Sequence, residues 1–567
     1  MRKLFKEFTP EKLEQVRTHP YYKNARETII ARADNYTVTD PPVMKFSKIH
    51  LYVECGNREI FEKDRIEYET RLHALFLAYI ITEDDKYLSP LSDIIWGICN
   101  FESWSIPAHV AEDLSIADRR RNLDLCSCIF GYRLSEILYL IGDKLPELVY
   151  RRAKAEVQYR IIDSFANHKD ERYFWLTTNN NWAAVCIAGV LCSYLYLATD
   201  EEIEAELPRM IEIADNYLAG FEEDGCCTEG YAYWNYGFSF FCLFAKMLSD
   251  YTDGEINYFK SEKVHNIAMF QQNILLNENE CLSFSDGGLS FEPYSWLSHF
   301  LKGIYPDMQL PALPDECITD YSTAPLPNGT PIRYIFWTNP DYVGDTLVPK
   351  SHRFKNAEWF LYHSKNYSLG AKAGHNDEFH NHNDVGSFLI SKGGRVTFCD
   401  PGGGEYTKEY FDIDHRYSIF VTSGKAHSVP VINGEYQVYG RREGHVEIFD
   451  EDRFRFSMKG GYDIDTLISL VRDFECLEDS VRLTDTYEFS EIPRSVTERF
   501  VSLLPIEEKD GTLVCGDSVL VFDRDAFDIS FGSEVVSRKR AEKETVYYVD
   551  LSVKAPKKQF ELTFEIR

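Results

Sequence analysis

The sequence predicts a multidomain protein in which an all-α domain precedes an all-β domain. Three observations predict this order. Apolar residues recur at helical spacing through the first three hundred residues, five prolines gather between residues 311 and 331, and short β-type runs separated by glycine follow. The 567 residues also exceed what one hydrophobic core usually serves, so about two or three domains are expected.

Helices are predicted for the first part of the chain from the spacing of its apolar residues. In residues 134–141 and 157–165 the apolar side chains fall on one helical face. Similar apolar blocks cover residues 72–81, 185–195 and 238–248. The blocks have the length of paired helices in an α/α array, although the periodicity is equally compatible with a plain helical bundle.

The later part of the chain is predicted to form strands. Residues 388–390 and 396–398 flank a Lys-Gly-Gly turn and indicate a hairpin. The run 429–432 leads into Asn433-Gly434, a second hairpin signal. The predicted boundaries are a helical domain at 1–310, a linker at 311–331 and a β-domain at 332–567.

Composition excludes some functions and locations. A net charge of −30 argues against a nucleic-acid partner, because phosphate contacts need a basic surface. The N-terminus has charge but no apolar signal segment, and no uncharged apolar run reaches the roughly 18 residues of a membrane span. The fourteen cysteines form no C-x-x-C pair. A reduced, cytoplasmic protein without a membrane partner is expected, whereas a mature chain whose signal had been removed would be periplasmic or secreted. The oligomeric state stays open, a homo-oligomer included.

The most specific cluster consists of histidines and an aspartate in the predicted β-domain. His380 and His382 are two residues apart, and such residues point to one face of a β-strand. Asp400 begins a turn after one strand-like run, and His427 precedes another. Three histidines and a carboxylate on neighbouring strands suit a divalent metal, with one imidazole left for proton transfer. A lone H-x-H is more often a surface pair, but the further matching residues favour a functional site.

Two polar clusters lie in the helical half. Three consecutive asparagines at 179–181 disfavour a helix interior and predict a loop or a helix start. Their amides either cap that helix or bind a substrate carboxylate without adding charge. Residues 224–237 combine Glu229 with three tyrosines and a tryptophan, a surface suited to sugar stacking and proton transfer. The alternative is aromatic core packing, because Tyr231, Tyr233 and Tyr236 cannot all face one way on a helix.

Three further residues are weaker candidates for substrate binding. Trp104 and His109 are proposed to line one substrate cleft together with the clusters described above. Arg416 could bind a substrate carboxylate through both nitrogens, or it could form a local ion pair with Asp414.

Together these clusters resemble the heparinase II/III-like polysaccharide lyase family. The resemblance covers most of the chain in domain order, and its specific part lies in residues 180–182, 229–234 and 380–427. It implies an incomplete (α/α) toroid followed by an antiparallel β-sandwich domain, with the active site in the cleft between them. It also implies cleavage of uronic-acid-containing polysaccharides by β-elimination, which makes an acidic oligosaccharide or polysaccharide the expected partner.

The resemblance also implies roles for individual residues. Asn181, with Asn180 beside it, matches the position that neutralises the uronate carboxylate, and hydrogen bonds there disperse charge in the transition state. Tyr233 and His380 match the acid/base pair, in an order that stays open. Trp182 stands where some relatives have a histidine. The resemblance therefore specifies neither the contacts to the uronate carboxylate nor the substrate. The positions that hold a structural zinc ion in some members match His382, Asp400 and His427.

Three other functions remain in competition. A glycoside hydrolase on an α/α toroid would use carboxyl groups such as Asp224 and Glu229. A cupin-like metal oxygenase would be built on His380, His382 and His427. A non-catalytic carbohydrate-binding protein would use the same cleft without chemistry. The sequence identifies neither the polysaccharide nor endolytic or exolytic action.

Overall fold

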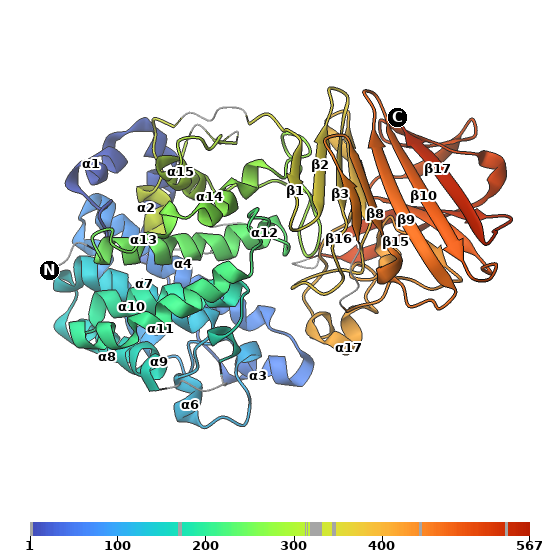
Figure 1. Ribbon diagram of the computed structural model, residues 1–567. Coiled ribbons are helices and arrows are strands. Elements are labelled where there is room, and N and C mark those ends of the chain that lie inside the picture. Colours follow the sequence, from blue (N-terminus) through green and yellow to red (C-terminus); the bar gives the residue numbers. More distant parts are fainter. Residues whose placement is uncertain are drawn as a thin grey trace. The chain divides into compact units, whose positions relative to one another are not determined.

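Helices occupy the first part of the chain and antiparallel strands the last part, in the predicted order (Figure 1). The computed structural model describes residues 4–167, 173–311, 313–314, 316–317, 331–342, 347–440, 445–538 and 542–567. The predicted linker lies largely outside the described residues, which leave out 318–330.

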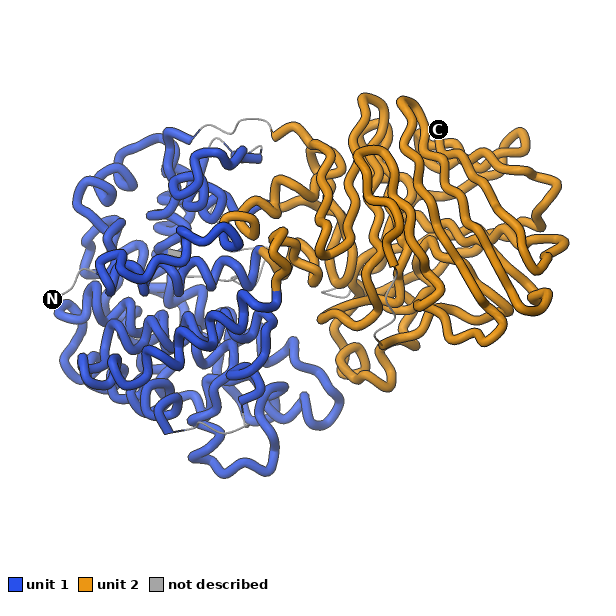
Figure 2. The backbone as a smooth tube through the Cα atoms, in the orientation of Figure 1, with its two compact units in different colours: residues 1–220, 235–264, 293–345 blue, residues 221–234, 265–292, 346–567 orange. Residues whose placement is uncertain are grey.

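The chain forms two compact units, and each unit is assembled from three separate stretches of the sequence (Figure 2). The first unit comprises residues 1–220, 235–264 and 293–345, and the second comprises 221–234, 265–292 and 346–567. Two short segments from the predicted helical half therefore belong to the strand-rich unit. The domain boundaries at 1–310, 311–331 and 332–567 stay a prediction.

The helices of the first unit confirm the predicted helical blocks. They are α1 (Pro10–Thr18), α2 (Lys23–Tyr36), α3 (Phe46–Cys55), α4 (Glu59–Thr82), α5 (Leu88–Cys99), α6 (Ile116–Arg120), α7 (Leu125–Ile141), α8 (Glu147–Val157), α9 (Asp163–Asn167), α10 (Asn181–Leu197), α11 (Asp200–Ala219), α13 (Ser239–Tyr251), α15 (Ser295–Ile304) and α16 (Pro331–Phe336). Helix α14 (Glu262–Met269) runs from the first unit into the second.

Helix α10 is the centre of the first unit. Its residues are apolar on every side, and a helix of that kind is normally buried. It contacts α7, α11 and α13, and nearly all of its side chains are buried. The polar residue Asn180 precedes it as the N-cap, which explains why the asparagine run ends where the helix begins.

Among the described helices, one is long and apolar enough to cross a membrane by length and composition, at Leu125–Lys144. Most of this window is buried inside the protein. Its two buried charged residues are paired, since Arg133 lies 3.0 Å from Glu69 and Glu136 lies 2.9 Å from Arg333. This pairing is what the core helix of a globular unit needs for buried charges.

The second unit is built from antiparallel sheets. Its strands are β1 (His352–Phe354), β2 (Trp359–His363), β3 (Tyr367–Lys372), β4 (Phe388–Lys392), β5 (Arg395–Phe398), β6 (Val431–Ile432), β7 (Val446–Phe449), β8 (Arg453–Ser457), β9 (Leu467–Cys476), β10 (Val481–Phe489), β11 (Val496–Ser502), β12 (Ile506–Lys509), β13 (Thr512–Cys515), β14 (Ser518–Val521), β15 (Phe527–Ser537), β16 (Lys543–Val553) and β17 (Gln559–Ile566). Two short helices, α12 (Tyr231–Tyr233) and α17 (Ile413–Arg416), belong to the same unit.

These strands form three sheets around one apolar core. The orders are β1-β2-β3-β4-β5, then β12-β13-β14-β17-β10-β9-β8-β7, and β15-β16-β11-β6. The core draws side chains from all three sheets, among them Phe388, Leu483 and Phe500. Strand β10 buries alternate residues, as expected for a strand with one face on a core.

The two predicted turns both form, but they close hairpins of different extent. Gly393 and Gly394 join β4 to β5 with φ values of 64° and 79°, as a two-residue type I′ turn requires. Asn433 and Gly434 also have positive φ values. Across this second turn a single antiparallel bridge joins Ile432 to Glu435, and β6 pairs further with β11.

Candidate active site

The segment that carries His380 and His382 is a loop and not the predicted strand. It lies between β3 and β4, and His380 has a φ of 58°, in the left-handed region that residues other than glycine rarely adopt. The reasoning from strand periodicity was therefore wrong. Both imidazoles nevertheless meet at one carboxylate, that of Asp286.

Asp286 is the centre of the polar cluster in the second unit. Its side chain is fully buried, in a turn of the segment 265–292. The hydrogen bonds that it accepts come from His380 Nδ1 at 2.7 Å, His382 Nε2 at 3.0 Å, Arg416 Nη2 at 3.2 Å, Tyr406 Oη at 3.3 Å and Tyr410 Oη.

This set of donors keeps Asp286 ionised. Burial alone would raise the pKa of Asp286, but the hydrogen bonds from His380 and His382 and the charge of Arg416 hold it well below its usual value. An ionised carboxylate only accepts hydrogen bonds. Each imidazole must therefore present an N–H to Asp286.

Tyr233 joins this cluster from α12. Its ring stacks on the His380 ring with centroids 4.1 Å apart, and its Oη lies 2.5 Å from Tyr406 Oη. Because Tyr406 donates its hydroxyl proton to Asp286, the hydrogen bond between the two tyrosines is donated by Tyr233. Burial, reinforced by the charge of Asp286, raises the pKa of Tyr233 well above its usual value. The hydroxyl therefore stays protonated at neutral pH.

Glu229 lies on the other side of the His380 ring. Its Oε2 is 3.7 Å from His380 Nε2, and its side chain is mostly buried. Burial raises the pKa of Glu229 from 4.5 to about 7, against the opposing effect of His380. The two ring nitrogens of His380 thus face two different carboxyl groups.

The raised pKa of Glu229 predicts a pH-dependent stability. The unfolded chain ionises near pH 4.5, whereas the folded protein keeps the proton until about pH 7, so stability falls as pH rises between these values. The Glu229→Gln variant should lack this loss, which amounts to about 3 kcal/mol at most. Denaturant unfolding at pH 5 and pH 8 measures the difference. The exposed Glu475→Gln variant is the control, and equal slopes in both variants would contradict the prediction.

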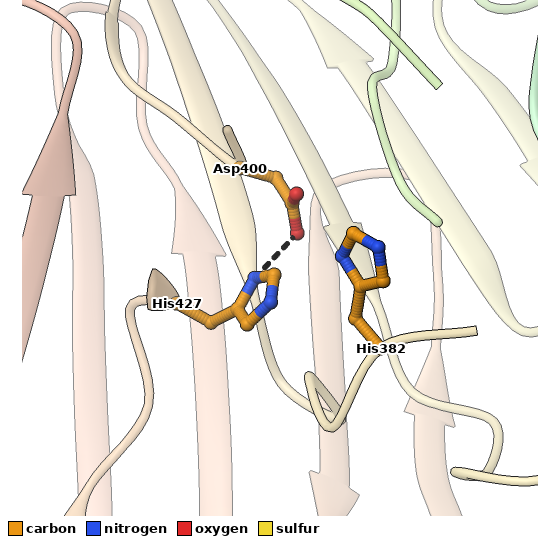
Figure 3. A group of neighbouring side chains, drawn as sticks. All are labelled: His382, Asp400 and His427. Atoms are coloured by element: carbon orange, nitrogen blue, oxygen red, sulfur yellow. Dashed lines mark hydrogen bonds and ion pairs between the residues drawn. The ribbon is translucent and has the colours of Figure 1, made fainter. Parts of the chain in front are cut away.

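A second cluster is suited to a metal ion. His382, Asp400 and His427 are all buried, and their ligand atoms lie within 4.8 Å of one another (Figure 3). Figure 3 shows the three side chains turned toward a common point. Asp400 Oδ2 is 2.9 Å from His427 Nδ1, and this contact with His427 helps to hold the pKa of Asp400 at about 2 despite its burial.

The donor atoms of this cluster fit a divalent cation. His427 Nε2 lies 3.0 Å from the carbonyl oxygen of Val421, and His382 Nε2 lies 3.0 Å from Asp286, so both rings direct Nδ1 toward Asp400. Within the described part of the chain, His382 Nδ1 is buried without a hydrogen-bond partner. A buried bare nitrogen is costly unless something binds it. Two imidazoles and a carboxylate are a common donor set for zinc.

The predicted asparagine cluster lies in the first unit. Asn180 accepts a hydrogen bond from the Trp182 backbone N–H at 3.0 Å, so its oxygen caps α10. Asn181 is the first residue of that helix and is largely buried. Trp182 contacts His109, with ring centroids 4.7 Å apart, and His109 Nδ1 is 2.8 Å from Asp124 Oδ2.

Two of the weaker candidates have other contacts than predicted. Trp104 is buried and its indole N–H donates to the Ile98 carbonyl, so it belongs to the core of the first unit. Arg416 is buried as well, and its ion pair is with Asp286 and not with Asp414. Neither side chain is open to a substrate in this structure.

Asp286, Tyr406 and Tyr410 were not predicted from the sequence. Asp286 precedes two glycines and reads as an ordinary turn residue. Tyr406 and Tyr410 stand between Asp400 and Arg416 in a stretch without a recognisable motif. Their importance follows only from the contacts that converge on Asp286.

Solved structures share the architecture of this chain. Heparinase III has a TM-score of 0.64 at 12% identity, covering 100% of this chain and 92% of that one. Heparan sulfate lyase HepC from Pedobacter heparinus has a TM-score of 0.57 at 13% identity, covering 98% and 90%. Streptomyces coelicolor A3 chondroitin AC lyase in complex with chondroitin sulphate has a TM-score of 0.53 at 10% identity, covering 98% and 81%.

No protein-family model matches this chain, and no curated protein matches it. At these identities the likeness to solved structures is a likeness of fold. The predicted fold class, an incomplete (α/α) toroid followed by an antiparallel β-sandwich, is confirmed. The chain has the fold of the heparinase III-like polysaccharide lyases.

Proposed function

We propose that this protein is a lyase that cleaves uronic-acid-containing oligosaccharides or polysaccharides by β-elimination, leaving a C4–C5 unsaturated uronate. The observation that carries the proposal is the stacked pair of Tyr233 and His380 on the buried carboxylate of Asp286. The shared fold supports it, since the similar structures include lyases of heparan sulfate and chondroitin.

The proton positions favour His380 as the base and Tyr233 as the acid. His380 donates through Nδ1 to Asp286, which leaves Nε2 with a lone pair for the C5 proton. The raised pKa of Tyr233 keeps this hydroxyl protonated, so it cannot begin the reaction as the base and it holds a proton for O4. This assignment is our proposal for the order that the sequence leaves open.

The reaction then balances as follows. His380 Nε2 takes the C5 proton, the electron pair of that bond forms the C4–C5 double bond, and the C4–O4 bond breaks. Tyr233 gives its proton to the departing O4. The imidazolium that forms lies 3.7 Å from Glu229, which would compensate its charge once the carboxyl group is ionised. Transfer of a proton from His380 back to Tyr233 restores the starting state.

Asn181 is proposed to hydrogen-bond the uronate carboxylate as charge develops beside it. Asn181→Ala should therefore lower kcat by about 10²–10³-fold with a smaller change in KM, because the hydrogen bond strengthens in the transition state. Steady-state kinetics on a uronate oligosaccharide measure both constants. Asn179→Ala, at an exposed neighbour, is the matched control. A change confined to KM would make Asn181 a uniform binder instead.

The contacts of the second unit do not favour the competing enzymes. A hydrolase would need a pair of free carboxyl groups, but Asp224 accepts backbone hydrogen bonds from Cys226 and Asn356. Asp286 is not a free carboxyl group either, because it accepts hydrogen bonds from five donors. A cupin-like site would need His380 beside the metal ligands, yet in the described residues the metal-type group is His382, Asp400 and His427.

We also propose that one zinc ion binds His382, Asp400 and His427 in a structural role. The ion would link the loop before β4 to the segments that carry Asp400 and His427. When bound, it would supply charge compensation and fixed geometry to these loops.

A panel of uronate oligosaccharides tests the proposed function. Heparan-type, chondroitin-type and alginate-type substrates are incubated with the protein, and the ultraviolet absorbance of a C4–C5 double bond is followed. A rise in absorbance supports elimination and identifies the substrate. Saturated reducing sugars without that absorbance would establish hydrolysis, and binding without any product would leave a carbohydrate-binding protein.

A further inference from the structure

Asp286 contacts the proposed base and a proposed metal ligand with its two oxygens. Oδ2 accepts from His380 Nδ1, and Oδ1 accepts from His382 Nε2. The carboxylate thus accepts a hydrogen bond from Nδ1 of one histidine and from Nε2 of another histidine two residues further along the chain. Asp286 itself is fully buried, so neither a substrate nor solvent reaches it.

The lone pairs of Asp286 are all in use. Two carboxylate oxygens offer about four acceptor positions, and the two histidines and three further donors share them. Arg416 and Tyr410 donate to Oδ1, and Tyr406 donates to Oδ2. A carboxylate that is saturated in this way cannot rotate to accept a proton or bind a ligand without breaking several bonds.

We propose that Asp286 is a positioning residue that sets the protonated nitrogen of His380 and of His382 in opposite senses. The inference rests on the proposed lyase function and deepens it. An N–H at Nδ1 leaves Nε2 of His380 as the base, and an N–H at Nε2 leaves Nδ1 of His382 for the metal. His427 Nε2 contacts the Val421 oxygen in a similar way, whereas its Nδ1 lies 2.9 Å from Asp400.

The same carboxylate also sets the direction of the tyrosine hydrogen bonds. Tyr406 gives its proton to Asp286 and therefore accepts that of Tyr233. One buried side chain in a turn of the segment 265–292 thus orients the base, the acid and a metal ligand. Asp286 thus links the proposed acid/base residues to the proposed metal site, although it is itself neither a proton-transfer group nor a metal ligand.

The direct test is nitrogen NMR of the zinc-loaded protein labelled with ¹⁵N-histidine, with His380→Ala and His382→Ala used for assignment. The unmutated protein is expected to carry the neutral His380 proton on Nδ1 and the His382 proton on Nε2. Asp286→Asn offers one acceptor oxygen and one donor nitrogen, so at least one ring should move its proton to the other nitrogen. His380 protonated at Nε2 in the unmutated protein would overturn the proposal, even if Asp286→Asn failed to fold.

Two further readouts separate positioning from plain destabilisation. In Asp286→Asn the zinc dissociation constant should rise by about 10–100-fold, and kcat should fall by about 10²–10⁴-fold with little change in KM. Asp473→Asn is the control, because Asp473 is a nearly buried carboxylate of the same unit that pairs only with Arg453 and Arg455 among the described residues. Equal effects in the two variants would overturn the proposal. If the protein cleaves no uronate, the nitrogen spectra and the zinc affinity still decide the role of Asp286.

Discussion

Tyr233→Phe is expected to lower kcat by about 10²–10⁴-fold while leaving the fold intact. The change removes one oxygen from a ring that keeps its stacking on His380, so little packing is lost. What disappears is the proton for O4 and the hydrogen bond to Tyr406. The measurement is the initial rate of absorbance by the unsaturated product, with circular dichroism to verify the fold.

Tyr231→Phe is the matched control for this prediction. Tyr231 lies two residues earlier in α12, and its ring packs on Trp234 and Phe291 in the interior of the second unit. Its kcat should stay within about threefold of the unmutated protein, since no proton-transfer group is touched. Near-normal turnover in well-folded Tyr233→Phe would remove this tyrosine from the mechanism.

His380→Ala should show a loss of the same order, for the complementary reason. It removes the nitrogen that takes the C5 proton and leaves Asp286 with four donors instead of five. Added imidazole should restore part of the rate if the ring acts only as a base. A variant that keeps its kcat would shift the base role to another group.

Removal of the metal is expected to give the largest change in stability. A ligand that binds only the folded state stabilises it by RT ln(1 + [L]/Kd), about 4 kcal/mol when the ion is present at a thousand times its Kd. Chelation should therefore lower the Tm of the second unit, and activity should decline as the loops around His382 loosen. A second redox-inert divalent metal should restore both together.

His382→Ala provides the control for chelation. It removes one ligand, so its lower Tm should no longer respond to chelator. Elemental analysis of protein purified without chelator gives the direct measurement of bound zinc. A metal-free protein that is fully active and equally stable would leave His382, Asp400 and His427 as an ordinary hydrogen-bonded cluster.

Local chemistry explains why parts of the fold could be predicted. Helix α10 is apolar on all sides and follows a run of asparagines, so its existence and a start near that run could be predicted from the sequence. The β4–β5 turn requires positive φ values, and Gly393 and Gly394 adopt them readily. The segment around His380 misled the prediction, because a two-residue spacing is compatible with a strand and also with an irregular loop.

The sequence by itself determined the order of helices before strands, and the family resemblance added the residues of the metal-type group. Periodicity and turn residues are properties of neighbouring positions, and neighbouring positions are what a sequence displays. Only the tertiary structure decided that His380 and Arg416 meet at Asp286 and that Tyr233 stacks on His380, although 183 positions of chain separate Tyr233 from Arg416. It also decided that Trp104 is core and that Asn180 is a cap. Such outcomes depend on which buried polar groups find partners across the fold, because an unpaired one costs more than any local preference supplies.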